Sequence, residues 1–249
     1  MSIWHALAIF AAGIAAGTIN TVVGSGTLIT FPTLLAFGYP PLVANVSNNI
    51  GLVPGTISGA LGYRRLLRGQ GRRVVPLAVA STAGGILGAT LLLSLPANAF
   101  KAIVPFFIGL ALLLIVTQRQ INRWLGHHRR REGEGASPAA AVGVFGSGVY
   151  GGYFGAAQGI LLLAILGLTV DDELQRLNAA KVVLAGTVNF VAGVIFVFAA
   201  HVDWPVAALI AVGSALGGVI GSRYGQRLSP TALRALIVVV GIVAITQLV

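Results

Sequence analysis

The sequence has no cysteine, and it has only 16 basic and 6 acidic residues among 249, so that 9% of the chain is charged. A soluble domain carries roughly 25% charged residues, which help to cover its apolar core. The absence of cysteine excludes a secreted domain held together by disulfides. A hydrophobic fraction of 56% excludes a disordered chain. The composition therefore predicts an integral membrane protein, with the lipid bilayer as a partner.

Patterns of catalytic and metal-binding residues are missing as well. The four histidines are His5, His127, His128 and His201. None of them is spaced with carboxylates as a metal site requires. The segment Gly24-Ser25-Gly26 is not the nucleophile elbow of hydrolases, and the chain lacks a glycine-rich phosphate loop ending in Lys-Ser or Lys-Thr. We therefore expect no catalytic residue, no metal site and no cofactor, and we expect that the chain is not an enzyme.

Long uncharged runs dominate the chain, beginning with the first 63 residues. A helix needs about 20 apolar residues to cross the hydrocarbon. Breaks at Pro, Gly and charged residues divide the chain into ten hydrophobic segments: 3–22, 26–38, 42–63, 74–94, 97–117, 138–154, 157–168, 178–200, 204–222 and 230–249. The segments 26–38 and 157–168 are too short to cross unaided, and the sequence leaves open whether they cross fully or re-enter.

The basic residues predict which loops face the cytoplasm. Thirteen of them form three clusters: Arg64, Arg65, Arg68, Arg72, Arg73; Arg119, Arg123, Arg129, Arg130, Arg131; and Arg223, Arg227, Arg234. Short loops rich in Lys and Arg stay on the cytoplasmic side. Topology thus explains the formal net charge of +10, and we expect no nucleic-acid partner. The predicted location is the bacterial cytoplasmic (inner) membrane, which the chain crosses several times.

The two halves of the chain resemble each other. Pro76, Gly84 and Gly88 have counterparts in Pro205, Gly213 and Gly217, and all matched positions are 129 to 134 residues apart. Charges differ between equivalent loops, because five arginines follow the third segment and none lies in the matching loop 201–203. Five segments per half would invert the second copy. The alternative is four crossings per half with re-entrant short segments.

We therefore predict an all-α polytopic membrane protein built from two inverted-topology repeats, each with the order long, short or broken, long, long, long. The first repeat spans 1–117, a basic cytoplasmic linker spans 118–137, and the second repeat spans 138–249. Many secondary transporters share this plan. Both termini are expected outside, and the sequence leaves a homodimer open.

Polar residues gather where the first long segment of each half breaks. Buried polar residues in a membrane usually line a cavity or pair with each other, and matched helix breaks mark transport sites. The free N-termini of such helices suit an anion. The predicted substrate-binding residues are Asn20, Gly24, Ser25, Gly26, Asn48, Asn49, Tyr153, Gly155, Gln158, Gly159, Asn178 and Lys181. For the asparagines, hydrogen bonding between helices is an equal alternative.

Glycine and lysine each allow two interpretations. The pairs Gly84/Gly88 and Gly213/Gly217 have the small-xxx-small spacing of closely packed helices, whereas Gly24 and Gly159 coincide with breaks. Lys181 is the basic residue that opens a long apolar segment beside a break, and we expect it to anchor an anion. The alternative is that Lys181 reaches the membrane surface or pairs with the acidic residues of 171–173.

In its motifs, the chain resembles the TauE/SafE sulfite exporter family. It looks like a membrane transporter similar to the uptake permeases for 4-toluene sulfonate. The resemblance rests on 16–26 with Phe31-Pro32 and Phe37-Gly38 in the first half, and on 178–181, Asn189-Phe190, 202–204 and 217–221 in the second. It implies transport of sulfite, sulfonates, sulfoacetate or another small organic anion. The second break, 155–159, has fewer glycines than is common among relatives.

Two classes of function follow from these observations. The first is a secondary transporter of a small, sulfur-containing anion, most simply an exporter, because a negative cell interior favours the exit of an anion. Proton- or cation-coupled uptake of an organic anion is the alternative within this class. The second class is a membrane scaffold that transports nothing, which the paired helix breaks disfavour.

Overall fold

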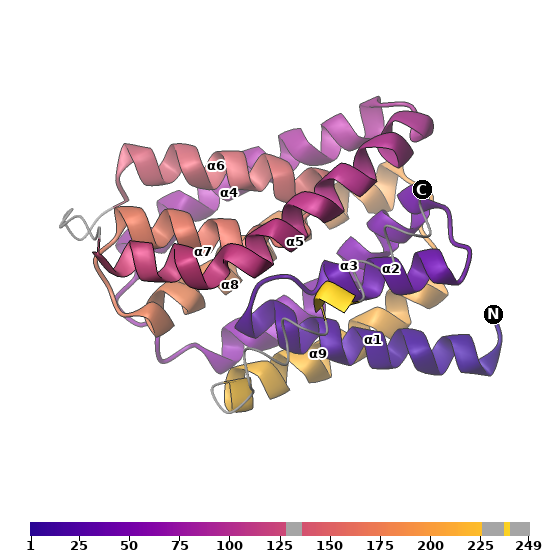
Figure 1. The fold of residues 1–249 in the computed structure, drawn as a ribbon, viewed down its shortest axis with the longest axis horizontal. Helices are drawn as coiled ribbons and strands as arrows, with labels where there is room; N and C mark the ends of the chain where they lie inside the picture. The colour runs from indigo at the N-terminus through magenta and orange to yellow at the C-terminus, as the bar shows by residue number, and fades with distance from the viewer. Residues whose placement is uncertain (128–135, 226–236, 240–249) are drawn as a thin grey trace.

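The computed structural model describes residues 1–127, 136–225 and 237–239, and within these ranges the regular secondary structure is entirely helical (Figure 1). The helices are α1 (Ile3–Val22), α2 (Thr27–Ala36), α3 (Pro41–Gly62), α4 (Gly71–Ser94), α5 (Ala97–His127), α6 (Pro138–Tyr153), α7 (Gln158–Thr169), α8 (Leu174–Ala199) and α9 (Trp204–Tyr224). They confirm eight of the ten predicted segments to within a few residues, and a ninth, 97–117, whose helix α5 continues ten residues further than predicted. The tenth, 230–249, lies outside the described residues except for 237–239.

Among the described residues, four helices are long and apolar enough to cross a membrane, namely α1, α4, α8 and α9. The chain is therefore an integral membrane protein. The helices α2 and α7 have only 10 and 12 residues, which makes them about 15 to 18 Å long at 1.5 Å per residue. The apolar part of α5 covers Ala102–Gln118, and the helix continues into the predicted linker as far as His127.

Side-chain caps fix three of the helix starts. Ser2 accepts a hydrogen bond from the His5 amide, and Ser137 accepts one from the Ala140 amide, each at 3.2 Å. At the start of α9, Asp203 accepts one from the Val206 amide at 3.0 Å. Each cap satisfies a main-chain N–H that has no partner within its own helix. The caps explain why α1, α6 and α9 begin where a short polar residue precedes the apolar run.

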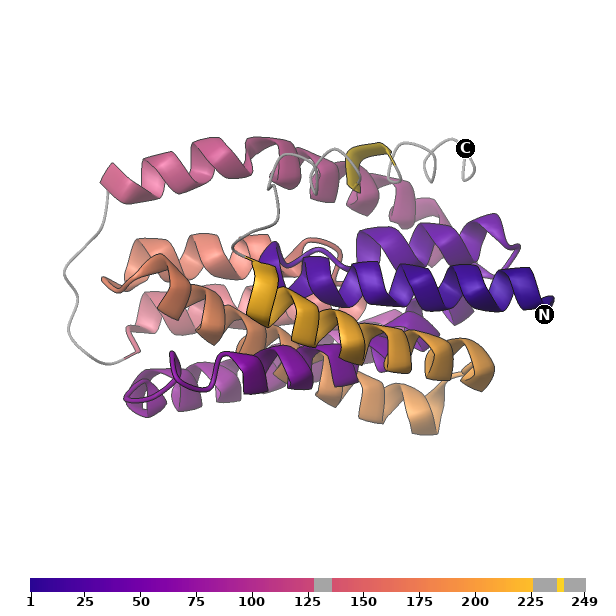
Figure 2. The same cartoon turned by 90° about the horizontal axis from the view of Figure 1, so that it is seen from below.

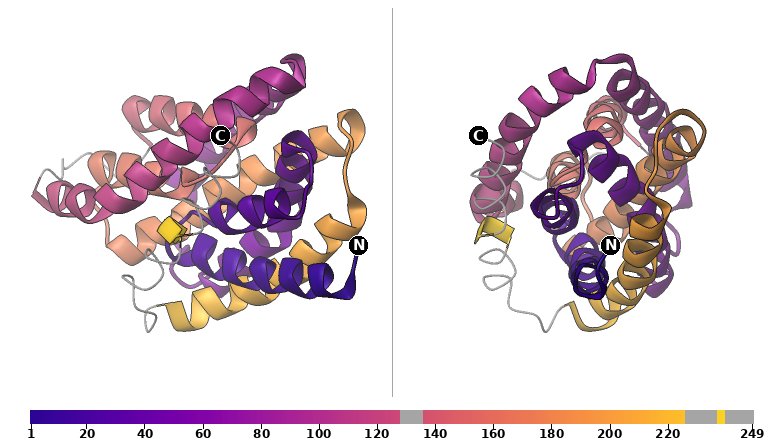
Figure 3. Two further views of the ribbon diagram at one scale, coloured as in Figure 1. Left: turned by 45° about the vertical axis from the view of Figure 1, so that its right-hand side comes forward. Right: turned by 90° about the vertical axis from the view of Figure 1, so that its right-hand side faces the viewer.

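Helices of the two halves exchange partners. In Figures 1 and 3, α4 from the first half lies with α6, α7 and α8, whereas α9 from the second half lies with α1, α2 and α3. The contact of α1 with α9 corresponds to the contact of α6 with α4. In the same way, the contact of α3 with α9 corresponds to that of α8 with α4. Figure 2 shows that the long helices run roughly along the long axis of the molecule. This exchange is what a two-fold relation between halves would produce, while their inversion across the membrane stays a prediction.

Glycine at the matched positions lets these helix pairs approach closely. A Cβ on Gly17 would clash with the main chain of Ser214 in α9, and one on Gly84 would clash with the main chain of Phe145 in α6. A Cβ on Gly213 or Gly88 would meet backbone in the same way. The packing interpretation of these glycines is confirmed. Close backbone approach compensates for the weak hydrophobic drive between helices in lipid.

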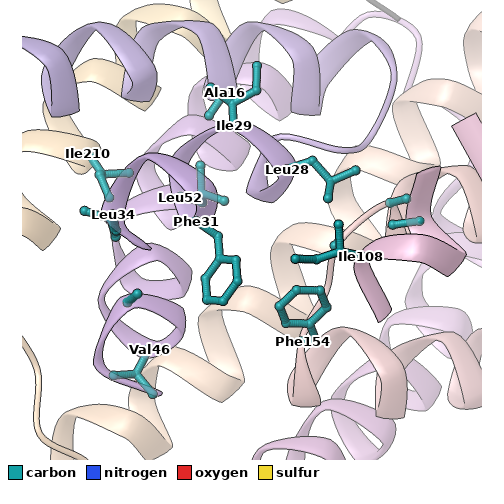
Figure 4. Packing of buried hydrophobic residues seen from close by; sticks show 14 of the residues in the cluster. Ala16, Leu28, Ile29, Phe31, Leu34, Val46, Leu52, Ile108, Phe154 and Ile210 are labelled. Atoms are coloured by element: carbon teal, nitrogen blue, oxygen red, sulfur yellow. The ribbon is translucent and has the colours of Figure 1, made fainter. Parts of the chain in front are cut away.

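An aromatic cluster joins α2 to the second helix break. The rings of Phe31 and Phe154 meet edge to face with centroids 5.2 Å apart, and both side chains are labelled in Figure 4. The ring of Phe107 in α5 stacks on Phe154 at 5.8 Å. Phe31 and Phe154 are almost completely buried. The cluster fixes the short helix α2 against the segment between α6 and α7.

Candidate functional site

Both predicted helix breaks are present and both contain left-handed backbone. Gly24 between α1 and α2 has φ +92°, and Gly155 between α6 and α7 has φ +77°. Glycine adopts this conformation at little steric cost. Ala157, which precedes α7, has φ 60° although it carries a Cβ. A non-glycine residue in this region is uncommon and strained, and such strain is concentrated at functional sites.

The two breaks touch each other through their main chains. The Gly159 amide donates a hydrogen bond of 3.0 Å to the Gly24 carbonyl. A Cβ added to either glycine would lie 2.5 Å from the Cα of the other. Only glycine at both positions allows this approach, because real Cβ atoms are not found so close to a backbone carbon. The structure therefore brings together the two segments that the sequence places 135 residues apart.

Lys181 in α8 lies at this junction and is fully buried, with 0% of its surface exposed. Its ammonium donates hydrogen bonds to the carbonyls of Asn20 at 3.3 Å and Thr21 at 3.2 Å. These carbonyls belong to the last turn of α1, where the helix dipole is negative. A Cβ on Gly159 would lie 3.1 Å from Lys181 Cδ, so the lysine stem passes along the second break. Lys181 thus contacts both breaks.

The alternative that Lys181 reaches the membrane surface is wrong, because its ammonium ends inside the protein. The carboxylate of Asp172, one of the proposed partners, binds Arg73 at 3.0 Å and Arg176 at 2.9 Å instead. Although partial burial by itself raises the pKa of Asp172, hydrogen bonds from the Glu173 amide, Arg176 and Arg73 outweigh that effect and lower the pKa. Asp172 is therefore ionised and paired at the end of the helices, away from Lys181.

Two asparagines hold the ends of the broken helices across the halves. Asn178 Nδ2 in α8 donates to the Thr21 carbonyl at 3.3 Å, and Asn45 Nδ2 in α3 donates to the Tyr153 carbonyl at 3.1 Å. The asparagines are 133 positions apart and the two acceptors 132 apart, within the offset of the repeat. Each half thus satisfies a C-terminal carbonyl of the other half's broken helix. Asn45 was absent from our predicted site, although its repeat position matched Asn178.

We expect Asn45→Ala and Asn178→Ala each to lower the free energy of unfolding by about 1 kcal/mol, since each change removes a buried hydrogen bond between the two halves. Because the two bonds lie in separate contacts, the double variant should lose about the sum. Unfolding of the purified variants in a mild detergent, followed by helix content, measures both values. A loss in only one of the single variants would contradict matched roles for these residues.

The main-chain N–H groups of the two breaks differ in whether they have hydrogen-bond acceptors. This corrects our expectation that both breaks offer free donors. At α7, the amides of Gln158, Gly159 and Ile160 already donate to main-chain carbonyls. At α2, the described hydrogen bonds include no acceptor for the amides of 25–27. Ser25 is 1% exposed, and its hydroxyl is buried without a partner. Among the described residues, donors without an acceptor are therefore found at the N-terminus of α2 and not at that of α7.

Asn48 and Gln158 connect neighbouring helices. The Thr30 hydroxyl donates to Asn48 Oδ1, and Asn48 Nδ2 donates to the Thr27 hydroxyl at 3.4 Å. These bonds join α3 to α2. Gln158 Nε2 donates to the Ser147 carbonyl at 3.2 Å, which joins α7 to α6. For these two residues, the structure favours hydrogen bonding between helices over direct contact with a ligand.

The remaining predicted residues fall into two groups. Gly26 packs against α1, because a Cβ there would clash with the Ala16 carbonyl. Polar atoms of Asn49 and Tyr153, in contrast, are buried without a hydrogen-bond partner. Most buried polar groups in proteins have a partner from protein, water or ligand. Asn49 Oδ1 and the Tyr153 hydroxyl are therefore candidates for contact with a polar ligand.

Comparison with known proteins covers almost the entire chain. Residues 9–248 match the family model described as "Sulfite exporter TauE/SafE". A "Probable membrane transporter protein ORF9" of Sinorhizobium sp is 30% identical, over 96% of this chain and 90% of that protein. A "Probable membrane transporter protein" of Haemophilus influenzae is 25% identical over 97% and 93%. The "Probable membrane transporter protein YfcA" of Escherichia coli K12 is 28% identical over 96% and 88%.

Proposed function

Because the chain belongs to the TauE/SafE sulfite exporter family and is a membrane transporter, we propose that it exports a small, sulfur-containing anion such as sulfite or a sulfonate. The proposed location is the bacterial cytoplasmic membrane. The observation that carries the proposal is the contact between the two helix breaks beside the fully buried Lys181. A matched pair of broken helices with a cation at their junction suits an anionic substrate.

In this proposal, Lys181 and the start of α2 have different roles in binding the anion. An anion that leaves water loses hydration, and a full positive charge offsets this cost better than backbone dipoles alone. Lys181 has three N–H donors, of which two bind α1 carbonyls. In the proposed site, its charge attracts the anion to the N-terminus of α2. The amides of 25–27 and the Ser25 hydroxyl then donate hydrogen bonds to it.

The membrane potential supplies a driving force for export. Moving one negative charge out of a negative interior gains about 2.3 kcal/mol per 100 mV. The carboxylates among the described residues are Asp171, Asp172, Glu173 and Asp203, which all precede a helix. None of these four lies beside Lys181 as a coupling-ion ligand would. This favours uncoupled export over proton- or cation-coupled uptake, the second candidate.

Counterflow in proteoliposomes tests the function. Vesicles loaded with unlabelled sulfite should accumulate external radiolabelled sulfite, and a panel of sulfonates should compete with it. Vesicles that contain protein with Gly24→Ala serve as the inactive control. Counterflow that requires a proton or sodium gradient would support the uptake alternative. Absence of counterflow with sulfite and with every sulfonate would contradict the proposed substrate class.

The proposed inverted topology predicts opposite sides for two loops. We expect Arg72→Cys to react with an impermeant thiol reagent only after the cells are permeabilised, and His201→Cys to react in intact cells. Both residues are exposed, and the native chain has no cysteine that could interfere. Labelling of both positions in intact cells would contradict the inverted arrangement. Gel-shift labelling of whole cells is sufficient to measure this.

A further inference from the structure

A basic cleft lies between the C-terminal ends of α3 and α9. It has a volume of about 350 Å³ and is lined by Arg64 and Arg65, which follow α3, by Arg223 of α9, and by Ser58 and Ser222. No carboxylate is among the lining residues that the structure describes. All three arginines are exposed. The cleft therefore carries a concentrated positive charge at a helix end of the bundle.

The floor of this cleft is fixed by close packing. The Ser58 hydroxyl donates to the Ala215 carbonyl of α9 at 2.9 Å, which ties α3 to α9. A Cβ on Gly62 would clash with the Ser222 side chain, so Gly62 allows the two helices to approach. The Ser222 hydroxyl donates to the Val219 carbonyl at 3.1 Å. Since both hydroxyl protons are engaged, the arginines supply the donors that a ligand can use.

An apolar groove adjoins the cleft on its α8 side. It has a volume of about 450 Å³ and lies between α3 and α8, lined by Ile57, Ala60, Leu67, Val183 and Phe190 among others. Leu61 and Arg64 line both the groove and the cleft. The side chains of Leu61 and Phe190 are 59% and 57% exposed. A charged cavity is thus continuous with an exposed apolar surface.

We propose that this composite site binds one anionic phospholipid, with its phosphate in the arginine cleft and an acyl chain along the α3–α8 groove. Guanidinium groups bind phosphate through paired, charge-assisted hydrogen bonds. Basic pockets between membrane helices on the cytoplasmic side are suited to anionic headgroups. A soluble anion would use the cleft alone, whereas a phospholipid uses both cavities and explains why they share Arg64 and Leu61.

The site is separate from the proposed transport site. Lys181 is buried at the junction of the two breaks, whereas the arginines of the cleft are exposed at helix ends. The lipid site therefore does not depend on which anion is transported. A bound lipid would bridge α3, α8 and α9, which belong to the two different helix groups of Figure 1. Its expected effect is on the cohesion of these groups.

Native mass spectrometry and lipid titration of the purified, delipidated protein test the proposal. The wild type should bind dioleoyl phosphatidylglycerol at least tenfold more tightly than dioleoyl phosphatidylcholine. Arg65→Gln/Arg223→Gln should weaken phosphatidylglycerol binding about 10- to 30-fold, because each arginine near a headgroup contributes on the order of a factor of five. Arg68→Gln/Arg72→Gln, which removes the same charge from exposed positions outside the cleft, should change it less than twofold.

Further experiments test binding of the phosphate headgroup and of the acyl chain separately. Glycerol phosphate and inorganic phosphate at millimolar concentration should not displace the lipid, and displacement would mean a small-anion site instead. Val183→Phe narrows the groove and should weaken lipid binding, whereas Val194→Phe, an exposed position outside the groove, should not. Equal weakening by both arginine pairs, or no preference for phosphatidylglycerol in the wild type, would overturn the proposal. Circular dichroism of each variant checks that the helices are retained.

Discussion

Replacement of Lys181 by glutamine is expected to weaken anion binding by at least tenfold and to abolish export. The substitution removes the positive charge that Lys181 places between the two breaks. A hydrogen bond to a charged group contributes about 1.5 to 3 kcal/mol, which corresponds to roughly 10- to 150-fold in affinity. Lys181→Arg should recover only part of the activity. A planar guanidinium does not reproduce a compact ammonium in a site closed by Gly159.

A structural role for Lys181 predicts a different pattern of results. The lysine also satisfies the carbonyls of Asn20 and Thr21, so its loss is expected to reduce stability by about 1 to 3 kcal/mol. Sulfite binding is therefore measured by calorimetry on protein that remains monodisperse and helical, together with its unfolding midpoint. Wild-type affinity combined with a lower midpoint in Lys181→Gln would assign the residue a purely structural role.

A methyl group at the junction is expected to have the largest effect on the fold. In Gly24→Ala, the new Cβ would lie 2.5 Å from Gly159 Cα, and the residue would hold a side chain at φ +92°. The left-handed conformation costs about 1 to 2 kcal/mol, and forcing extra volume into a packed site costs about 1 to 3 kcal/mol more. We expect a total loss of about 2 to 5 kcal/mol and no transport.

Gly38 provides a matched control for this experiment. It has φ +82°, but a Cβ there would meet nothing within 4 Å. Gly38→Ala should therefore lose only the conformational part, about 1 to 2 kcal/mol, and should retain transport. The difference between the two variants isolates the contact between the breaks. Similar unfolding midpoints and similar transport rates for both variants would show that the close approach of Gly24 and Gly159 is unimportant.

The helix ends could be predicted because charge, proline and glycine mark them in a membrane protein. The run before Arg64 and the polar loop 201–203, for example, set the ends of α3 and α8. The same local logic located both breaks, since a short apolar segment cannot span the bilayer. Their matching positions in the two halves placed residues of both breaks in one predicted site. Lys181 was found for the same reason, as a charge beside a break.

Features that depend on the partner of each group could not be predicted. The sequence shows amides at the start of α7 but not that Gly24 and other carbonyls accept their hydrogen bonds. It also shows several asparagines without distinguishing Asn48, which joins α3 to α2, from Asn49, whose oxygen has no partner. Asn45 was missed because its acceptor, the Tyr153 carbonyl, is a main-chain group 108 residues away, and main-chain acceptors carry no sequence signal.

The exchange of helices between the halves also determines when the protein can complete its fold during synthesis. The glycine faces of α1 and α3 are closed by α9, which leaves the ribosome roughly 140 residues after the end of α3. At 5 to 20 residues per second, the delay is on the order of ten seconds. During that time, Gly17 and Gly55 face lipid or the insertion machinery instead of Ser214. Assembly of the group formed by α1, α2, α3 and α9 is therefore a late event, governed by the arrival of α9 and not by the insertion of α1.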